Sequence, residues 1–436
     1  MTTIHRGSPI GLPCLILSVF LAACAAPSVL APVSPVSEPT AIAPPTQPPA
    51  TATNPPPTRT PSLPPADEAA SRITVPAGFA IHIFAQGLRG PRLMAFGPDG
   101  MLYVTLTGAG QIARLPDKNH RGAADGIEIV AGDLSAPHGI EWHDGWLYVA
   151  ESGRVERFDG TFAKRELVTD NIPSGGGHFT RTLHFGPDGK LYVSGGSSCN
   201  ICVESDPRRA AILRFNPDGT IPADNPFASD PDPRRQAVWA SGLRNSVDFL
   251  WTPNGQLWAN VNGVDGLGDD KPPEIIVAAI ERGKSYGWPY CYNPTLGRTN
   301  ATPLVRDTRL ALPQGFDCAM AVPALFTDLA HSAPLGMSSA RSGNFPAAMQ
   351  NDLFVAYHGS WNSSAPRDCK VERVVIENGV PVRSEDFASG WRPAGRQCGD
   401  SATWGRPADV IFGPDGAMYI SDDKGGRVYR VVFVGQ

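Results

Sequence analysis

Short apolar stretches recur along the chain, and each follows a turn sequence that interrupts the apolar pattern. Pro98-Asp99-Gly100 illustrates the arrangement, because it is followed at once by an alternating apolar stretch of the kind that forms a β-strand. Asp-Gly and Asn-Gly supply the positive φ that a tight hairpin turn requires, so each copy predicts a β-hairpin. The six stretches are Leu102-Tyr103-Val104, Leu147-Tyr148-Val149, Leu191-Tyr192-Val193, Leu257-Trp258, Leu353-Phe354-Val355 and Met418-Tyr419-Ile420.

The spacing of these hairpins predicts the architecture. Gly100, Gly145, Gly189 and Gly255 stand 45, 44 and 66 residues apart, and repeats of roughly 40–50 residues with short strands are typical of propeller blades. Two unrelated β-domains would not produce one hairpin that recurs throughout. We therefore predict an all-β fold, a single six-bladed β-propeller of four-stranded antiparallel blades over residues 69–436, with insertions in blades four and five.

The N-terminus predicts an export signal and a tether. Residues 1–24 are largely apolar from Leu12 to Ala23, and Leu21-Ala22-Ala23-Cys24 resembles the bacterial lipobox, in which the cysteine becomes the lipidated N-terminus. An ordinary secretory peptide cut near Ala26 is the alternative. Both interpretations predict export. The first also predicts a lipid anchor at the outer side of the cell membrane, on the cell surface or in the periplasm.

Residues 25–68 predict a disordered linker. Of the 42 residues from Ala25 to Ala66, fourteen are proline, mixed with Thr, Ser and Ala. Such a composition does not bury a core and forms a semi-extended tether.

Charge and hydropathy exclude two function classes. Charged residues make up 18% of the chain and the net charge is −5, which argues against a nucleic-acid partner. After the N-terminus no stretch of 18 uninterrupted apolar residues occurs, which argues against a polytopic membrane protein.

Export favours disulfides for the six cysteines that remain beyond Cys24. Six cysteines permit fifteen connectivities, and pairing by neighbours gives the smallest loops. Cys199-Asn-Ile-Cys202 has two alternatives, half of a metal site or a redox motif. The neighbour pairs are Cys199–Cys202, Cys291–Cys318 and Cys369–Cys398.

Basic residues stand near the start of the strands that enter the hairpins. Such a strand should be the innermost of its blade, and its start should line the central channel. Arg pairs with carboxylates and His donates or accepts, so together these residues predict a pocket for an anion, although each one alone is better explained as structural. They are Arg92, His138, His178, Arg244 with Asn245 beside it, His331 and Arg406.

Several motifs resemble the soluble quinoprotein glucose/sorbosone dehydrogenases, nearest the sorbosone-dehydrogenase-like branch, from about Ile73 to Phe433. The resemblance implies a six-bladed propeller that binds pyrroloquinoline quinone (PQQ) and Ca²⁺ over its channel and oxidises a sugar. The motifs are Gly177-His178-Phe179-Thr180-Arg181, Gly242-Leu243-Arg244-Asn245, Asp265-Gly266-Leu267-Gly268-Asp269-Asp270, Tyr286-Gly287-Trp288-Pro289-Tyr290 and His358-Gly359-Ser360-Trp361-Asn362.

The resemblance also implies roles for individual residues. His178 matches the catalytic histidine, and an imidazole suits removal of a hydroxyl proton near neutral pH. The carbonyls of Gly263 and Val264 match the pair that holds Ca²⁺, which prefers oxygen ligands. The residues expected at PQQ are Arg244, Asn245, Arg406, His358 as a cationic ligand, and His138 near the substrate.

Two departures from the family pattern bear on the site. The carboxylate that orients the base in the glucose enzymes is Ser197 here, so control of the tautomer is expected from another group. A second channel arginine is replaced by Ala408.

Three function classes therefore remain. The first is a PQQ-dependent sugar or aldehyde dehydrogenase, with a cytochrome or membrane quinone as its electron acceptor. The second is a lactonase-type propeller hydrolase, which would need a carboxylate-rich metal site. The third is a non-catalytic surface module that binds a glycan or a protein. Fold alone does not separate them.

Overall fold

The computed structural model describes residues 63–340 and 344–435, all within the compact unit Pro56–Gln436. The predicted signal peptide, Cys24 and all but the last residues of the predicted linker lie outside the described residues. The described part contains one α-helix, α1 (Glu68–Arg72). None of its helices is long and apolar enough to cross a membrane.

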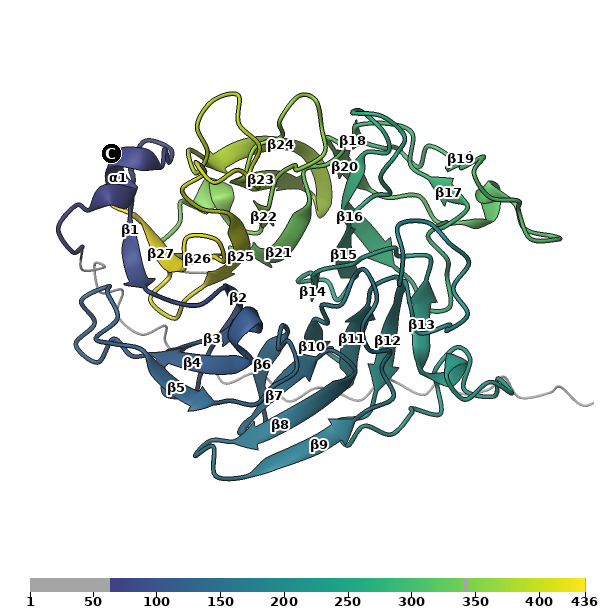
Figure 1. Ribbon diagram of the computed structural model, residues 1–436, viewed down its shortest axis with the longest axis horizontal. Coiled ribbons are helices and arrows are strands. Elements are labelled where there is room, and N and C mark those ends of the chain that lie inside the picture. The colour runs from purple at the N-terminus through teal and green to yellow at the C-terminus, as the bar shows by residue number, and fades with distance from the viewer. Residues whose placement is uncertain (1–62, 341–343, 436) are drawn as a thin grey trace, which may run out of the picture. The chain divides into compact units, whose positions relative to one another are not determined.

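Six antiparallel sheets confirm the predicted propeller (Figure 1). Blade 1 consists of β2 (Pro91–Phe96), β3 (Leu102–Leu106), β4 (Gln111–Leu115) and β5 (Glu128–Ala131). Blade 2 consists of β6 (Ile140–His143), β7 (Trp146–Glu151), β8 (Arg154–Asp159) and β9 (Arg165–Thr169). Blade 3 consists of β10 (Leu183–Phe185), β11 (Leu191–Gly195), β12 (Ala211–Phe215) and β13 (Val238–Ser241).

The second half repeats the pattern with additions. Blade 4 consists of β14 (Phe249–Trp251), β15 (Leu257–Val261), β16 (Glu274–Ile280) and β20 (Phe326–Asp328), with β18 (Gly297–Arg298) as a fifth strand. Blade 5 consists of β21 (Pro334–Ser339), β22 (Leu353–Tyr357), β23 (Lys370–Glu377) and β24 (Val380–Ala388). Blade 6 consists of β25 (Pro407–Phe412), β26 (Met418–Asp422), β27 (Arg427–Phe433) and β1 (Phe79–Gln86).

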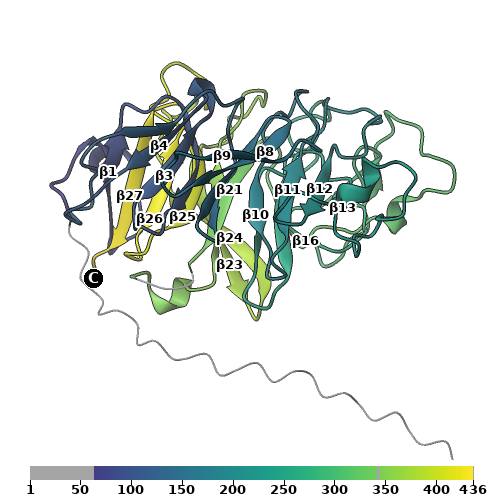
Figure 2. The same cartoon turned by 90° about the horizontal axis from the view of Figure 1, so that it is seen from below.

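Strand β1 completes the last blade, which the hairpin repeat did not predict. Its residues pair antiparallel with β27 from Phe79 opposite Phe433 to Gln86 opposite Arg427. The two ends of the described chain therefore meet in one sheet and close the ring, and Figure 2 shows β1, β27, β26 and β25 in sequence from the side.

The turn motif recurs because its aspartate holds the two following strands. In blade 1 the Tyr103 hydroxyl donates to Asp99, and Arg114 from the third strand lies 2.7 Å from the same carboxylate. The glycine of the turn has a φ of 74°, which only glycine adopts without strain. The same arrangement is found in blade 3 with Asp188, Tyr192 and Arg214, and in blade 6 with Asp415, Tyr419 and Arg430.

The long insertion of blade 4 carries its own disulfide. Residues 281–325 connect β16 to β20 and include the two-stranded sheet of β17 (Cys291–Tyr292) and β19 (Val305–Arg306). Cys291 is bonded to Cys318 there. The other bonded pairs are Cys199–Cys202 and Cys369–Cys398, so all three neighbour pairings are confirmed.

The innermost strand of each blade is the one that enters its hairpin, as predicted, and carboxylates connect these strands to one another. The strands β2, β6, β10, β14, β21 and β25 stand at one end of their sheets and line a common cavity. Met94 N–H donates to Asp409 at 2.9 Å, and Met337 N–H donates to Asp248 at 2.7 Å. Glu141 accepts the Phe185 N–H in the same way at 3.3 Å. Each carboxylate comes from an even-numbered blade and holds an amide of the next blade.

One histidine joins two of these carboxylates. His184 Nδ1 lies 2.8 Å from Glu141, and its Nε2 lies 2.9 Å from Asp248. Although burial opposes protonation, hydrogen bonds to Asp248 and Glu141 raise the pKa of His184 to about 10. The imidazolium therefore persists at neutral pH and neutralises part of the acidic cluster.

We expect His184→Gln to destabilise the protein in a pH-dependent way. The loss near pH 6.5 should be about 2–3 kcal/mol, below the 3–5 kcal/mol of a fully buried pair because the ring borders a cavity. A histidine with a raised folded pKa contributes fully below its unfolded pKa of about 6.5, and this contribution is lost as the pH rises through 10. Denaturant unfolding of both proteins from pH 6.5 to 10 measures the difference between their free energies of unfolding, which should shrink as the pH rises. His143→Gln, which removes a ring 3.4 Å from the exposed Asp144, should keep the wild-type pH dependence. A difference that stays constant up to pH 10 would contradict the assignment.

Candidate functional site

His178 lies on a loop that a buried arginine braces. The loop connects β9 to β10, and Arg181 within it is fully buried. The Arg181 guanidinium donates to the carbonyl of Pro173 at 2.6 Å and to that of His178 at 2.9 Å. Arg181 therefore fixes the backbone that carries His178, which is the bracing role that a buried guanidinium with carbonyl partners performs.

Ser197 contacts the imidazole of His178 directly. Nδ1 lies 2.8 Å from the Ser197 hydroxyl oxygen and 3.1 Å from its carbonyl oxygen. Ser197, which stands in place of the carboxylate of the glucose enzymes, therefore reaches the ring with its hydroxyl. In the described part of the chain Nε2 has no hydrogen-bond partner. Burial, reinforced by the positive charge of Arg244, lowers the pKa of His178 to about 4, so the ring is neutral above about pH 5.

Arg244 and Asn245 lie beside His178. Arg244 is 5% exposed, and its guanidinium contacts Asn200 and lies 3.3 Å from Asp265. A Cβ on Gly196 would stand 2.6 Å from the His178 Cβ and 2.7 Å from the Asn245 Oδ1. Only glycine at position 196 therefore lets the histidine and the asparagine approach this closely.

The predicted metal ligands follow β15, next to Asn245. The Asn245 amide donates to Asn262 at 3.0 Å, and Gly263 comes next in the chain. Gly263 N–H donates to the buried Glu274 at 2.5 Å. Across residues 63–340 and 344–435, no hydrogen bond ends on the carbonyl oxygen of Gly263 or Val264. Two such oxygens suit a hard cation.

Arg406 and His358 form a second group around Asp423. Arg406 Nε donates to the His358 carbonyl at 2.8 Å, and His358 Nε2 lies 2.9 Å from Asp423. Arg92 lies 2.7 Å from the other oxygen of that carboxylate. Although burial opposes it, His358 and Arg92 lower the pKa of Asp423. Burial lowers the pKa of His358 to about 4 despite Asp423, so at neutral pH the positive charge on this side is carried by the two arginines rather than by His358.

His138 and His331 occupy different surroundings. His138 is 1% exposed, its Nδ1 lies 3.3 Å from the Thr182 hydroxyl, and burial lowers its pKa to about 3. His331 lies 3.6 Å from Asp265, and its Nε2 contacts the Gly268 carbonyl. The neighbouring carboxylate of Asp265 raises the pKa of His331. Arg244 and His331 therefore lie around Asp265, and Arg92, Arg406 and His358 lie around Asp423, whereas His138 and His178 belong to neither group.

The sequence analysis did not identify the carboxylates that pair with the basic residues of the channel. Asp423 follows β26, and Asp265 lies four residues after β15. The two strands of a hairpin are antiparallel, so the second strand ends beside the start of the first. Residues that follow the second strand therefore lie near residues that precede the first. From the predicted hairpins alone, that rule could have found Asp423 after β26, just as it places Ser197 after β11 and His358 after β22, which the family resemblance had already indicated.

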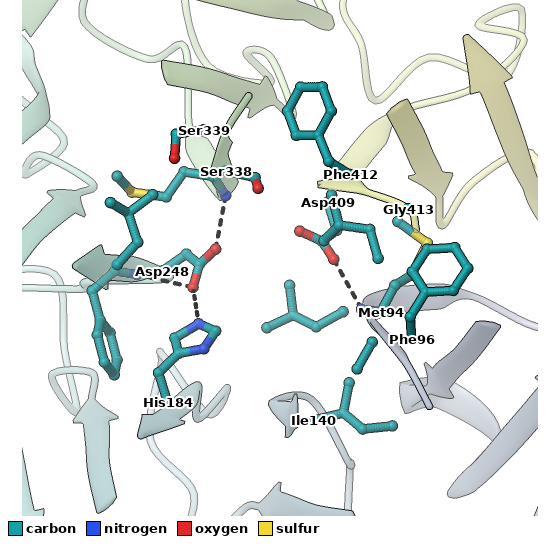
Figure 3. A pocket seen from close by; sticks show the side chains of 16 residues that line it. Met94, Phe96, Ile140, His184, Asp248, Ser338, Ser339, Asp409, Phe412 and Gly413 are labelled. Carbon is teal, nitrogen blue, oxygen red and sulfur yellow. Dashed lines mark hydrogen bonds and ion pairs between the residues drawn. The ribbon is translucent and has the colours of Figure 1, made fainter. Parts of the chain in front are cut away.

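A cavity of about 440 Å³ lies further along the inner strands (Figure 3). Asp248 and Asp409 face each other across it, and His184 lies against Asp248. The buried cluster of Val247, Leu335 and Ala408 precedes this level on β14, β21 and β25 or just before them. The carboxylates here hold backbone amides. His178 precedes β10 and the two carbonyls follow β15, which is the end of the inner hairpins at which that cluster lies. We therefore place the candidate site at the His178 end.

The sequence profile described as TrAA12-like matches residues 73–433. The chain is 27% identical over 392 residues to the aldose sugar dehydrogenase YliI of Escherichia coli, covering 82% of this chain and 93% of that protein. It is 26% identical over 435 residues to the pyrroloquinoline quinone-dependent pyranose dehydrogenase of Coprinopsis cinerea, covering 84% of this chain. The match spans 56% of the length of the Coprinopsis enzyme.

Solved structures show the same fold. The holo form of the pyranose dehydrogenase PQQ domain from Coprinopsis cinerea superposes with a TM-score of 0.68 at 23% identity, over 83% of this chain and 97% of that one. The calcium structure of the family AA12 enzyme from Trichoderma reesei gives a TM-score of 0.67 at 20% identity, over 83% of this chain and 97% of that one.

Proposed function

The chain belongs to the TrAA12-like family, and from that membership we propose that it is an exported quinoprotein that oxidises a sugar with PQQ and Ca²⁺ as cofactors. One observation carries the proposal. Within the described residues, a neutral histidine whose Nε2 has no hydrogen-bond partner stands beside a buried Arg-Asn pair and two carbonyls that accept no hydrogen bond. The relatives named as PQQ-dependent or aldose sugar dehydrogenases support the reaction class.

The residues present fit both cofactors. The carbonyls of Gly263 and Val264 would hold Ca²⁺, which takes oxygen ligands. Arg244, Asn245 and Arg406 would bind the anionic cofactor, and within the described residues Arg406 leaves its Nη1 without a partner. Bound PQQ would supply an electrophilic quinone as the hydride acceptor. His178 would take the hydroxyl proton at Nε2, since Nδ1 is engaged with Ser197.

We further propose that Cys24 carries a lipid anchor and that a cytochrome or a membrane quinone reoxidises the protein. The motif Leu21-Ala22-Ala23-Cys24 supports the anchor. Cys24→Ala should move the protein from the membrane to the soluble fraction, and Cys14→Ala, within the same segment, is the matched control. A Cys24→Ala protein that still pellets with membranes would refute the anchor.

Reconstitution tests the function and its anion pocket together. PQQ and Ca²⁺ added to the purified protein should give a bound-quinone spectrum and dye-linked oxidation of aldoses. Arg244→Ala and Arg406→Ala should each weaken PQQ binding by about 1.5–3 kcal/mol, or roughly 10- to 150-fold in Kd, the range of charge-assisted hydrogen bonds. Arg234→Ala, on an exposed loop with Asp232, is the control and should bind as the wild type does. Wild-type affinity in both channel variants would show that these arginines serve another ligand.

His178→Ala tests the base. The variant should retain PQQ and Ca²⁺, because other residues hold them, while dye-linked turnover falls by about 10²–10⁴-fold, the usual contribution of a positioned base. The wild-type turnover should be constant above about pH 5 and decline only as the pH falls through 4, where the imidazole becomes protonated. His143→Ala is the control histidine. Near wild-type turnover in His178→Ala would remove His178 from the reaction, and a parallel loss of PQQ would assign it to cofactor retention.

A further inference from the structure

The four-residue loop between Cys199 and Cys202 contacts both chemical groups of the candidate site. Cys199 and Cys202 are joined by a disulfide, and the loop follows β11. On one side it meets Ser197, which contacts the base, and on the other side Asn200 meets Arg244. No other described disulfide lies between the predicted base and a predicted cofactor ligand in this way.

The hydrogen bonds around Ser197 determine where the proton of His178 lies. The Ser197 hydroxyl is 2.8 Å from the carbonyl oxygen of Cys199, which can only accept, so the hydroxyl donates its proton there. That hydroxyl oxygen must then accept from His178 Nδ1, and the Ser197 carbonyl, 3.1 Å away, can only accept as well. Both contacts require the proton on Nδ1. The lone pair of the neutral ring is therefore on Nε2, where a general base needs it.

The backbone of this segment leaves little freedom for the arrangement to change. Ser197 is fully buried, and its N–H donates to the Arg244 carbonyl at 2.8 Å. The Gly177 N–H, next to His178, donates to the Ser198 carbonyl at 2.8 Å. The Ser198 hydroxyl in turn donates to Glu204 at 2.9 Å.

Asn200 performs the corresponding task for the guanidinium. Arg244 Nε donates to the Asn200 main-chain carbonyl at 3.0 Å, and its Nη2 donates to Asn200 Oδ1 at 2.8 Å. The same Oδ1 accepts the Asp265 N–H at 2.8 Å. The side chain of Asn200 therefore fixes the position of Arg244 relative to Asp265.

We propose that the disulfide-closed loop 199–202 is a positioning element that fixes His178 in its Nδ1–H tautomer through Ser197 and orients Arg244 through Asn200. This proposal rests on the proposed function for its catalytic meaning, whereas the tautomer itself is a property of the protein without cofactor. Unlike a carboxylate at this position, the Ser197 hydroxyl orients the His178 ring without adding a negative charge beside it. The charged groups that face the His178 ring are Arg244, Asp265 and Arg181. Burial and the two arginines lower its pKa and keep it neutral, although Asp265 acts in the opposite direction.

The first test reads the tautomer directly. In protein labelled with ¹⁵N-histidine and free of cofactor, the His178 signals, assigned with His178→Gln, should show a protonated Nδ1 and a bare Nε2 at pH 7. Ser197→Ala should give a mixture of tautomers and reduce kcat about tenfold at unchanged KM, while Ser197→Thr, which keeps the hydroxyl, should retain the wild-type spectrum. A wild-type signal with the proton on Nε2 would overturn the proposal.

The second test reads the charge at position 197. Ser197→Asp should stabilise the imidazolium, so the acidic limb of the kcat–pH profile should move at least one unit toward neutral pH. A merely structural role for Ser197 predicts lower activity with an unmoved limb, and that result would overturn the proposal.

The third test opens the loop. Cys199→Ser/Cys202→Ser should mix the His178 tautomers and weaken PQQ binding about tenfold. Cys291→Ser/Cys318→Ser removes a disulfide that closes a longer loop in the blade 4 insertion, and it should leave the His178 signals unchanged. Wild-type tautomer signals in the Cys199/Cys202 variant would refute the role of the loop. A fixed tautomer in a protein that binds no PQQ would instead refute the proposed function and leave the positioning intact.

Discussion

Closing a ring of six sheets is the constraint on which the rest of this structure depends. The ring closes through β1, which pairs with β27 although the two strands lie at opposite ends of the folded chain. The innermost strands then stand close enough for carboxylates of even-numbered blades to hold amides of the next blade, as Asp409 does with Met94. Backbone groups buried at a channel must find partners, because an unpaired amide there costs about 1–3 kcal/mol. These contacts set the spacing of the blades, and the spacing brings the site residues together.

Charge compensation then determines what the channel end can bind. Arg92 and Arg406 are arranged around Asp423, whereas Arg244 and His331 are arranged around Asp265. Buried guanidinium groups need such partners, because an unpaired buried charge is strongly unfavourable. Among the described residues these partners leave Arg406 Nη1 without a hydrogen bond, and the proposed anion site would use this donor. For His178, burial and the charge of Arg244 outweigh the nearby Asp265, and the lowered pKa keeps the imidazole in the form that accepts a proton.

The two levels of the channel perform different tasks with similar residue types. Around the 440 Å³ cavity, a histidine held by two carboxylates is protonated, and the carboxylates hold backbone amides. At the candidate site, a histidine held by a serine hydroxyl is neutral and leaves one nitrogen free. The partner of Nδ1 therefore distinguishes a structural imidazolium from a candidate base. Two histidines six positions apart, His178 and His184, have opposite protonation for this reason.

The sequence by itself determined the hairpins and the innermost strands, because turn chemistry and strand alternation act between residues that are close along the chain. It favoured the cysteine pairs by their short loops, but it did not indicate that β1 completes the last blade. It also marked His178, Arg244, Asn245, Arg406 and Gly263 for the site through motifs. Only the tertiary structure decided the partners of these residues. Met94 meets Asp409 across 315 positions, and Asn362 meets Asp265 across 97, distances over which no local pattern constrains the contact. The tertiary structure also decided the protonation states. The neutral state of His358 and the hydrogen bonds of Ser197 depend on burial and on the groups that the closed propeller places beside each side chain.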